Sequence, residues 1–241
     1  MRFRVRRVTT TRAGGVSKPP FDTFNLGDHV GDDPAAVATN RHRLATAVGL
    51  AAGSGGDRIV WMNQVHSSRV QVVDDPREKP DETDGLVTTR SGLALAVVTA
   101  DCVPVLMADA RAGVVAAVHA GRVGAQNGIV THALDTMRSA GAHVEDVSVL
   151  LGPAVSGRNY EVPEQMAVEV ERALPGSRTT TARGTAGLDL RAGIAAQLRT
   201  AGVSAIDIDP RCTVADRELF SHRRDAPTGR LASLIWLEPA R

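Results

Sequence analysis

Reactive side chains stand where apolar, strand-like runs of this sequence end. Cys102 follows Asp101 between LALAVVTA and VPVLMA, and His119 ends the run VVAAV. His66 has a similar place, after the strand-like RIVWM and the polar NQV. Functional side chains are common where a strand gives way to a loop. Two imidazoles and one thiolate would bind Zn²⁺ and leave a fourth position for water or substrate, which is typical of a catalytic zinc.

The spacing of these residues leaves other interpretations open. They are far apart in the sequence, and no short motif such as C-x-x-C joins them. Cys102 with His119 would equally suit a metal-free cysteine hydrolase or amidase acting on a cell-wall precursor, with Asp101 or another acid as the orienting group. A thiolate beside an imidazolium is activated by its lowered pKa. The third alternative is an inert buried cysteine beside two hydrogen-bonded histidines.

Four further residues receive structural or supporting roles. Asp84, in TDG, and Asp101 are candidates to orient ligand side chains by accepting hydrogen bonds. Tyr160, the single tyrosine, and Cys212 are predicted to be structural.

Composition narrows the class of protein. The chain has 241 residues, of which 43% are hydrophobic and 23% charged, as expected for one soluble globular domain over residues 1–241. The net charge of +1 gives no electrostatic case for binding nucleic acid or a membrane surface. Two cysteines are too few for a disulfide framework, and neither a signal peptide nor an apolar membrane span is recognised. We therefore expect a cytoplasmic protein.

The elements that must position the reactive side chains follow from hydrophobic periodicity. Helices are predicted from Pro34 to Gly49, over 123–140, from Pro163 and over 190–201, with Asp33 and Asp189 as N-caps. Strands are predicted over 4–9, 58–62, 69–73, 85–89, 93–99, 103–108, 113–119, 147–153, 204–208 and 231–237. Several consecutive strands lack a helix between them. This favours a mixed α/β or α+β protein with mixed sheets over a Rossmann fold.

Eight spaced motifs then carry a family resemblance. They are TRAGGVS, NLGDHVGDDPAAVATNR, NQVHSSRV, TDGLVTT, TADCVPVLMAD, VAAVHAG, LGPAVSGRNYEV and ELFSHRRD. In this order, from about Thr10 to Trp236, the chain resembles the YfiH/laccase-domain (DUF152) family. Its members have been named polyphenol oxidases and purine nucleoside phosphorylases. The resemblance implies a single-domain layered α/β/β/α fold.

The resemblance also implies a metal site and a reaction. His66 in NQVH, Cys102 in ADC and His119 in VHAG match the family's zinc ligands and catalytic centre. The implied activity is phosphorolysis of adenosine, inosine and methylthioadenosine, with adenosine deamination as a side activity. The partners are then a nucleoside and phosphate, for a monomer or homodimer.

Cationic residues in the family-like motifs are candidates to hold the substrate or phosphate. They are Arg12, Arg41, Arg223 and Arg224, together with His222. Many relatives read HAGWRG where this chain reads HAGRVG at residues 119–124, so the pocket wall beside His119 differs.

The older family name supplies an alternative, a copper-dependent, laccase-like polyphenol oxidase. Multicopper oxidases resemble one another in repeated H-x-H pairs, and this chain contains none. Copper is therefore expected only as a competitor of zinc at the His₂Cys site.

Overall fold

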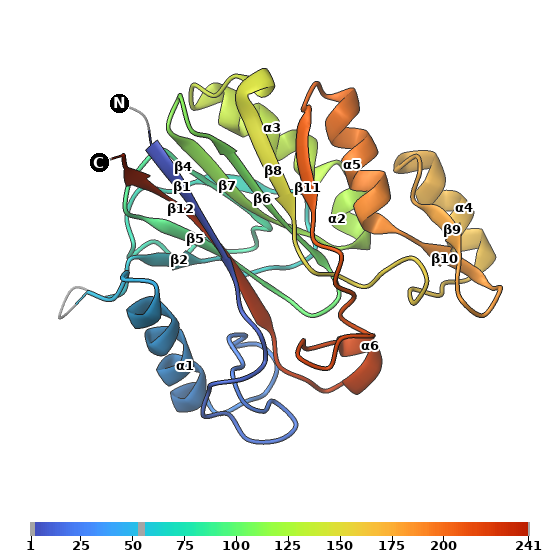
Figure 1. The fold of residues 1–241 in the computed structure, drawn as a ribbon, viewed down its shortest axis with the longest axis horizontal. Helices are drawn as coiled ribbons and strands as arrows, with labels where there is room; N and C mark the ends of the chain where they lie inside the picture. The colour runs from blue at the N-terminus through green and yellow to red at the C-terminus, as the bar shows by residue number, and fades with distance from the viewer. Residues whose placement is uncertain (1–2, 53–55, 241) are drawn as a thin grey trace.

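Two mixed β-sheets stack face to face in the computed structural model, which describes residues 3–52 and 56–240 (Figure 1). The four-stranded sheet has the order β1 (Phe3–Thr9), β12 (Leu231–Pro239), β5 (Ala94–Thr99), β2 (Ile59–Trp61). The six-stranded sheet has the order β11 (Ala205–Ile208), β8 (Val147–Leu151), β6 (Val103–Asp109), β7 (Val114–Ala120), β4 (Gly85–Thr88), β3 (Val70–Val72). Both sheets contain parallel and antiparallel pairs.

The alternation of side chains along β7 explains the stacking. Val114, Ala116 and Val118 belong to the core beneath the helices. Val115 and Ala117 belong to the core between the two sheets. Successive side chains of a strand point to opposite faces, so a strand that is apolar at every position is buried on both. An apolar run of this kind must therefore lie between two layers.

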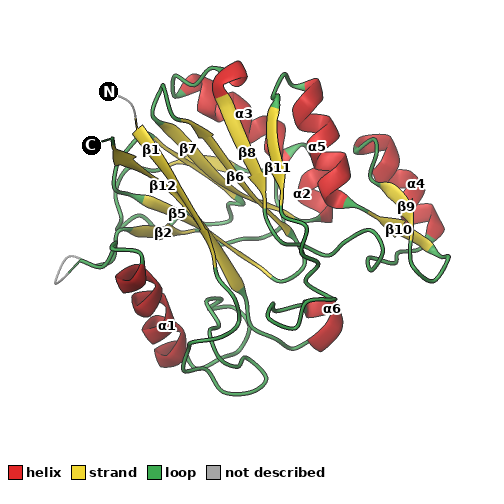
Figure 2. Ribbon diagram, viewed as in Figure 1, coloured by secondary structure: helices red, strands yellow, loops and turns green. Residues whose placement is uncertain are grey.

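Helices cover the two outer faces of the stacked sheets (Figure 2). The six-stranded sheet shares its outer core with α2 (Arg122–Gln126), α3 (Ile129–Ser139), α4 (Glu164–Ala173) and α5 (Leu190–Thr200). The four-stranded sheet packs against α1 (Pro34–Ala47) through Leu44 and Ala45. The order of layers is α/β/β/α, which confirms the mixed fold expected above. The prediction of one domain over 1–241 includes residues 1–2, 53–55 and 241, which lie outside the described residues.

The helix ends test the capping predictions. Asp33 accepts a hydrogen bond from the N–H of Ala35, and Asp189 accepts one from the N–H of Ala192. Both N-caps are confirmed.

The helix predicted over 123–140 is instead two helices, α2 and α3, separated at Asn127 and Gly128. Gly128 has φ +75°, a left-handed conformation that ends one helix and turns the chain into the next. Four short elements were not predicted: the 3₁₀ turn Val144–Asp146, β9 (Arg178–Thr180), β10 (Ala186–Leu188) and α6 (His222–Asp225).

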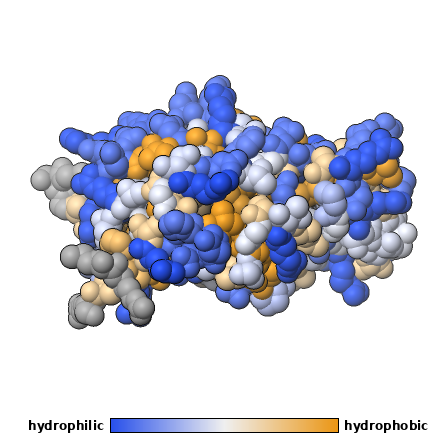
Figure 3. Space-filling view, turned by 90° about the horizontal axis from the view of Figure 1, so that it is seen from above, coloured by the Kyte–Doolittle hydropathy of each residue, from blue (hydrophilic) through white to orange (hydrophobic). Residues whose placement is uncertain are grey.

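The surface is largely hydrophilic on the face drawn in the space-filling view, with smaller apolar areas between the polar side chains (Figure 3). Within the described part of the chain, no helix is long and apolar enough to cross a membrane.

Candidate metal centre

Three elements bring His66, Cys102 and His119 together. Cys102 lies in the turn before β6, His119 is in β7, and His66 lies in the loop between β2 and β3. The antiparallel register of β6 and β7 sets Pro104 opposite His119, so the start of one strand meets the end of the other. The ligand atoms all lie within 4.8 Å of one another. Cys102 Sγ is 3.8 Å from His66 Nε2.

The donor set fits a divalent metal ion. Ligand atoms around one tetrahedral zinc lie about 3.5 Å apart, which small side-chain movements would reach from the separations seen here. His119 Nδ1 lies 2.8 Å from a carboxylate oxygen of Asp84. The hydrogen therefore belongs on Nδ1, and Nε2 is the nitrogen available for a metal. Within the described residues, 3–52 and 56–240, this is the one group of three or more histidine, cysteine or acidic side chains that could hold a metal ion.

Asp84 orients two of the three candidate ligands. Its buried carboxylate accepts hydrogen bonds from the backbone N–H groups of Val65, His66 and Ser67 and from the hydroxyl of Ser67. It also holds Nδ1 of His119. Burial raises the pKa of Asp84, but these hydrogen bonds and the His119 charge outweigh it and lower the pKa to about 2. Asp84 therefore makes the contacts expected of the predicted orienting residue.

Cys102 and His119 shift each other's pKa in opposite directions. Burial raises the pKa of the Cys102 thiol, but the charge and hydrogen bonds of His119 and His66 outweigh it and lower the pKa to about 6. Burial lowers the pKa of His119, but the Cys102 charge and Asp84 raise it to about 9. Both shifts favour the thiolate, which is the form of cysteine that binds metals and acts as a nucleophile.

The backbone at Gly121 passes close to the side chains of His66 and Cys102, and the absence of a side chain on this residue leaves room for them. A Cβ atom at this position would lie 2.7 Å from Cδ2 of His66 and 3.1 Å from Sγ of Cys102. The φ of Gly121 is −74°, so any residue could adopt its backbone conformation. Glycine is needed here because a side chain would displace the ligands.

A cavity of about 430 Å³ opens on the three ligands. Its size lies within the usual range for small-molecule sites. Of the predicted substrate-binding residues, His222 and Arg223 line it. The apolar part of its wall includes Val98, Ala100, Val155 and Leu190. The structure thus brings His66, Cys102, His119, His222 and Arg223 into one place.

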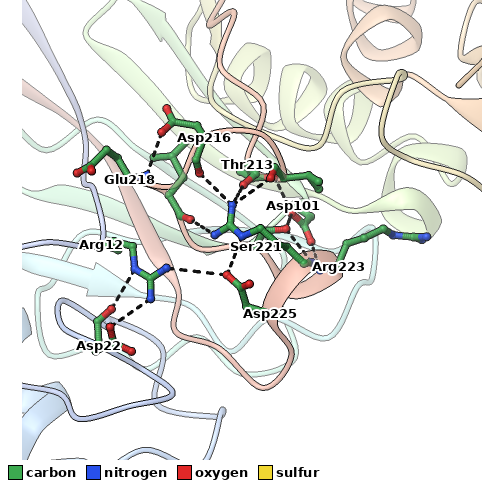
Figure 4. Close-up of polar contacts among 12 residues, drawn as sticks. Arg12, Asp22, Asp101, Thr213, Asp216, Glu218, Ser221, Arg223 and Asp225 are labelled. Carbon is green, nitrogen blue, oxygen red and sulfur yellow. Dashed lines mark hydrogen bonds and ion pairs between the residues drawn. The ribbon is translucent and has the colours of Figure 1, made fainter. Parts of the chain in front are cut away.

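Arg12 and Arg224 do not line this cavity. Arg12 lies between the carboxylates of Asp22 and Asp225, at 3.4 and 3.9 Å (Figure 4). Arg224 pairs with Asp225 at 2.7 Å and donates to backbone carbonyls, among them that of Thr213. Their charges are already compensated within the protein, and both residues serve to hold the C-terminal loops.

Arg41 is also outside the cavity. Its guanidinium pairs with Asp28 at 3.2 Å, donates to the carbonyl of Leu26 and stacks 4.1 Å from the centroid of the Trp61 ring. Burial lowers its pKa, and Asp28 acts in the opposite direction. Arg41 therefore joins α1 to the neighbouring loop and strand.

Two arginines that the sequence reasoning missed line the cavity together with Arg223. They are Arg122, in the HAGRVG segment, and Arg230, just before β12. The three guanidinium groups donate only to neutral oxygens: Gln126 Oε1 for Arg122, the Glu161 carbonyl for Arg223, and the Thr228 and Gly229 carbonyls for Arg230. None has an ion-pair partner among the described residues. The departure at HAGRVG pointed to Arg122, whereas no motif marks Arg230.

The contacts of Asp101 differ from those expected of a residue that orients a ligand, whereas those of Cys212 agree with its predicted structural role. The carboxylate of Asp101 binds α6 and the loop before it, and no contact of it orients a metal ligand (Figure 4). Cys212 Sγ accepts hydrogen bonds from the N–H and hydroxyl of Ser156, at 3.3 and 3.2 Å, outside the lining of the cavity.

Comparisons with known proteins identify the family of the chain. The model of a family described as multi-copper polyphenol oxidoreductase laccase matches residues 6–238. A Mycobacterium tuberculosis protein named purine nucleoside phosphorylase is 75% identical over 236 residues, covering 98% of this chain and 93% of that protein.

Two crystal structures show the same fold. A Neisseria meningitidis protein assigned to DUF152 matches with a TM-score of 0.87 and 35% identity, covering 98% of this chain and 95% of that one. A Bacillus licheniformis protein described as hypothetical protein YfiH matches with a TM-score of 0.88 and 32% identity, covering 97% and 93%. The chain therefore belongs to the YfiH-like laccase-domain family.

Proposed function

We propose that the protein is a zinc-dependent purine nucleoside phosphorylase that accepts adenosine, inosine and methylthioadenosine and deaminates adenosine as a side activity. The observation that carries the proposal is a single cavity that holds a His₂Cys group together with three guanidinium groups that have no ion-pair partner in the described part of the chain. The name of the relative that is 75% identical supports the same reaction.

Phosphorolysis requires an anion and a nucleoside to meet in a fixed geometry. An oxygen of phosphate forms a bond to the anomeric carbon of the ribose while the glycosidic bond breaks. The bonding electrons leave with the purine, which takes up a proton, and the product is ribose 1-phosphate. Holding the two reactants together removes much of the entropic barrier. The cavity offers apolar walls for the base and cations for phosphate, so both can be bound side by side.

Arg122 and Arg230 join Arg223 as the candidates for binding phosphate, in place of Arg12, Arg41 and Arg224. A guanidinium group that already faces a carboxylate gains little from a second anion. One that donates only to neutral oxygens keeps its positive charge available for bidentate binding of phosphate. Of the original candidates, Arg223 and His222 are retained.

His66, Cys102 and His119 would hold the zinc ion. Bound there, the ion would supply a Lewis acid within the cavity. The protein's own part is to keep Cys102 as the thiolate and to fix the Nε2 lone pair of His119 through Asp84.

The test is a nucleoside screen on zinc-loaded protein, with and without phosphate, followed by liquid chromatography of the released base and assay of ribose 1-phosphate. We expect base release that depends on phosphate. His66→Ala, Cys102→Ala and His119→Ala should each lose both zinc and phosphorolysis, whereas Cys212→Ala, the matched control for the thiol, should retain both. Normal turnover in a variant that holds no zinc would refute the proposal.

A metal-free hydrolase is the second candidate, because His119 lies between Asp84 and Cys102 as a base lies between an orienting acid and a nucleophile. Hydrolysis that survives complete removal of zinc and stops on alkylation of Cys102 would favour it.

The family description also suggests a copper oxidase. A multi-copper enzyme needs several ligand groups, and the described residues provide one. Phenol oxidation by the protein as isolated, without ribose 1-phosphate from inosine, would favour that activity.

A further inference from the structure

The carboxylate of Asp101 joins the turn that carries Cys102 to α6. One oxygen accepts hydrogen bonds from the hydroxyls of Thr213 and Ser221, at 2.6 and 2.7 Å. The other accepts the backbone N–H of Arg223 at 2.6 Å (Figure 4). Hydrogen bonds to an ionised group are shorter and stronger than those between neutral groups. Asp101 therefore ties residues more than a hundred positions away to the start of β6.

These contacts determine how α6 begins. The hydroxyl of Ser221 accepts the N–H of Arg224 at 3.2 Å, so its own hydrogen is free to point to Asp101. The N–H of Arg223 is bound directly by Asp101. The first N–H groups of a helix have no partner within the helix, and a helix of one turn depends on the groups that bind them. The orientation of α6 therefore depends on Asp101.

The side chain of Arg223, in α6, faces the cavity from this position. Its guanidinium lies 4.9 Å from the centroid of the Tyr160 ring and donates to the carbonyl of Glu161 at 3.1 Å. Both contacts fix its direction without compensating its charge. A rotation of α6 would move this guanidinium relative to the metal ligands.

The backbone of Asp101 is itself held firmly. Its carbonyl accepts the N–H of Val155, which also lines the cavity. Its φ is +97°, in the left-handed region that is unfavourable for a residue other than glycine. A residue in such a conformation persists only where the surrounding contacts hold it. Asp101 is thus a fixed point beside Cys102.

We propose that Asp101 is a positioning residue, which fixes α6 against the Cys102 turn so that Arg223 forms an anion contact in the cavity. The inference rests on the proposed function in taking phosphate as the anion.

The experiment is calorimetric titration of zinc-loaded protein with inorganic phosphate. It compares the wild type, Asp101→Asn, Arg223→Gln and the double variant. Asparagine keeps the size of aspartate and tolerates a positive φ, so the substitution changes the charge and the hydrogen bonds alone. Each single variant should bind phosphate about tenfold more weakly, as expected for a lost hydrogen bond to a charged group. The double variant should bind no more weakly than Arg223→Gln, because Asp101 acts through Arg223.

The matched control is Asp109→Asn at the opposite end of β6. Asp109 likewise accepts three hydrogen bonds, in its case all from backbone N–H groups, those of residues 111, 112 and 143, but it lies outside the cavity lining. Zinc content and phosphate affinity should stay at the wild-type level in this control. In phosphorolysis assays, Asp101→Asn should raise the KM for phosphate and leave the KM for the nucleoside unchanged, a split that general destabilisation would not produce.

Several outcomes would overturn the inference. They are unchanged phosphate affinity in Asp101→Asn, multiplicative effects in the double variant, loss of zinc from Asp101→Asn, or a wild type that binds no phosphate. If Asp101→Asn does not fold, Ser221→Ala removes one of the same hydrogen bonds and must weaken phosphate binding. Phosphate binding that follows the expected pattern without phosphorolysis of any nucleoside would support the inference and refute the proposed function.

Discussion

Asp84 reaches the His66 loop and the His119 ring with one carboxylate, so two ligands that are distant in sequence share one anchor. Every group around it donates a hydrogen. Both oxygens of the aspartate carboxylate accept hydrogen bonds, whereas the amide of an asparagine would place its NH₂ group, a donor, against some of these donors.

Asp84→Asn should therefore weaken zinc binding about 10- to 100-fold, the usual effect of removing a group that orients a metal ligand. Competition with a chromophoric chelator measures this affinity. Asp109→Asn serves as the control for an equally buried carboxylate away from the cavity. Zinc affinity equal to the wild type would show that Asp84 does not orient the ligands.

Gly121→Ala provides a steric test at the same scale. The added methyl group would approach His66 and Cys102 more closely than van der Waals contact permits. We expect less than one equivalent of bound zinc by elemental analysis after gel filtration, with an unchanged far-ultraviolet circular dichroism spectrum. A full equivalent of zinc in this variant would show that the ligands can move aside.

Among the elements, β6 is fixed at both ends by aspartates. Asp109 closes the turn to β7 through Arg111 and Ala112 and reaches across to the N–H of His143. Burial raises its pKa, but the three hydrogen bonds outweigh burial, so the pKa of Asp109 is lowered. A carboxyl with a lowered folded-state pKa stabilises the fold above its unfolded pKa, about 3.9, and this contribution is lost as the pH falls through the folded value.

Asp109→Asn should lower the free energy of unfolding by about 1–2 kcal/mol at pH 7. The difference from the wild type should shrink below about pH 4, because a protonated carboxyl loses the same acceptor as the amide. Urea unfolding at pH 7 and pH 3 measures it, with a chelator present so that proton-linked release of zinc does not contribute. A difference that is independent of pH would contradict this role of the carboxylate.

At the scale of the whole molecule, the candidate metal centre lies where the two sheets are connected. His119 belongs to the six-stranded sheet, whereas Cys102 and His66 lie in the segments that lead from the four-stranded sheet to it, from β5 to β6 and from β2 to β3. A ligand that binds only the folded protein stabilises it according to its concentration relative to Kd. A bound ion would therefore hold the layers together in addition to serving the reaction.

Removal of zinc should lower the midpoint of thermal unfolding. At a free zinc concentration of 100 times Kd, the expected loss is about 2.7 kcal/mol. Differential scanning calorimetry before and after chelation, and after zinc is restored, measures the change, and Cys102→Ala should show no response to zinc. Equal midpoints with and without zinc in the wild type would contradict the assigned ligands.

The sequence by itself determined most of the long elements, the mixed α/β class and the three candidate ligands. Apolar runs such as 93–99 and 114–120 are hydrophobic at every position, which requires burial on both faces. The motifs around His66, Cys102 and His119 are local, so they could be recognised before the fold was known.

Only the tertiary structure decided which charges face the cavity. The sequence does not distinguish one arginine from another, because the role of each depends on which groups lie within a few ångströms of its guanidinium. Arg12 and Arg41 meet carboxylates of neighbouring loops, whereas Arg122 and Arg230 meet neutral oxygens. The partners of Asp101 lie more than a hundred residues along the chain. These contacts between distant residues form only when the layers pack together, so no local sequence pattern predicts them.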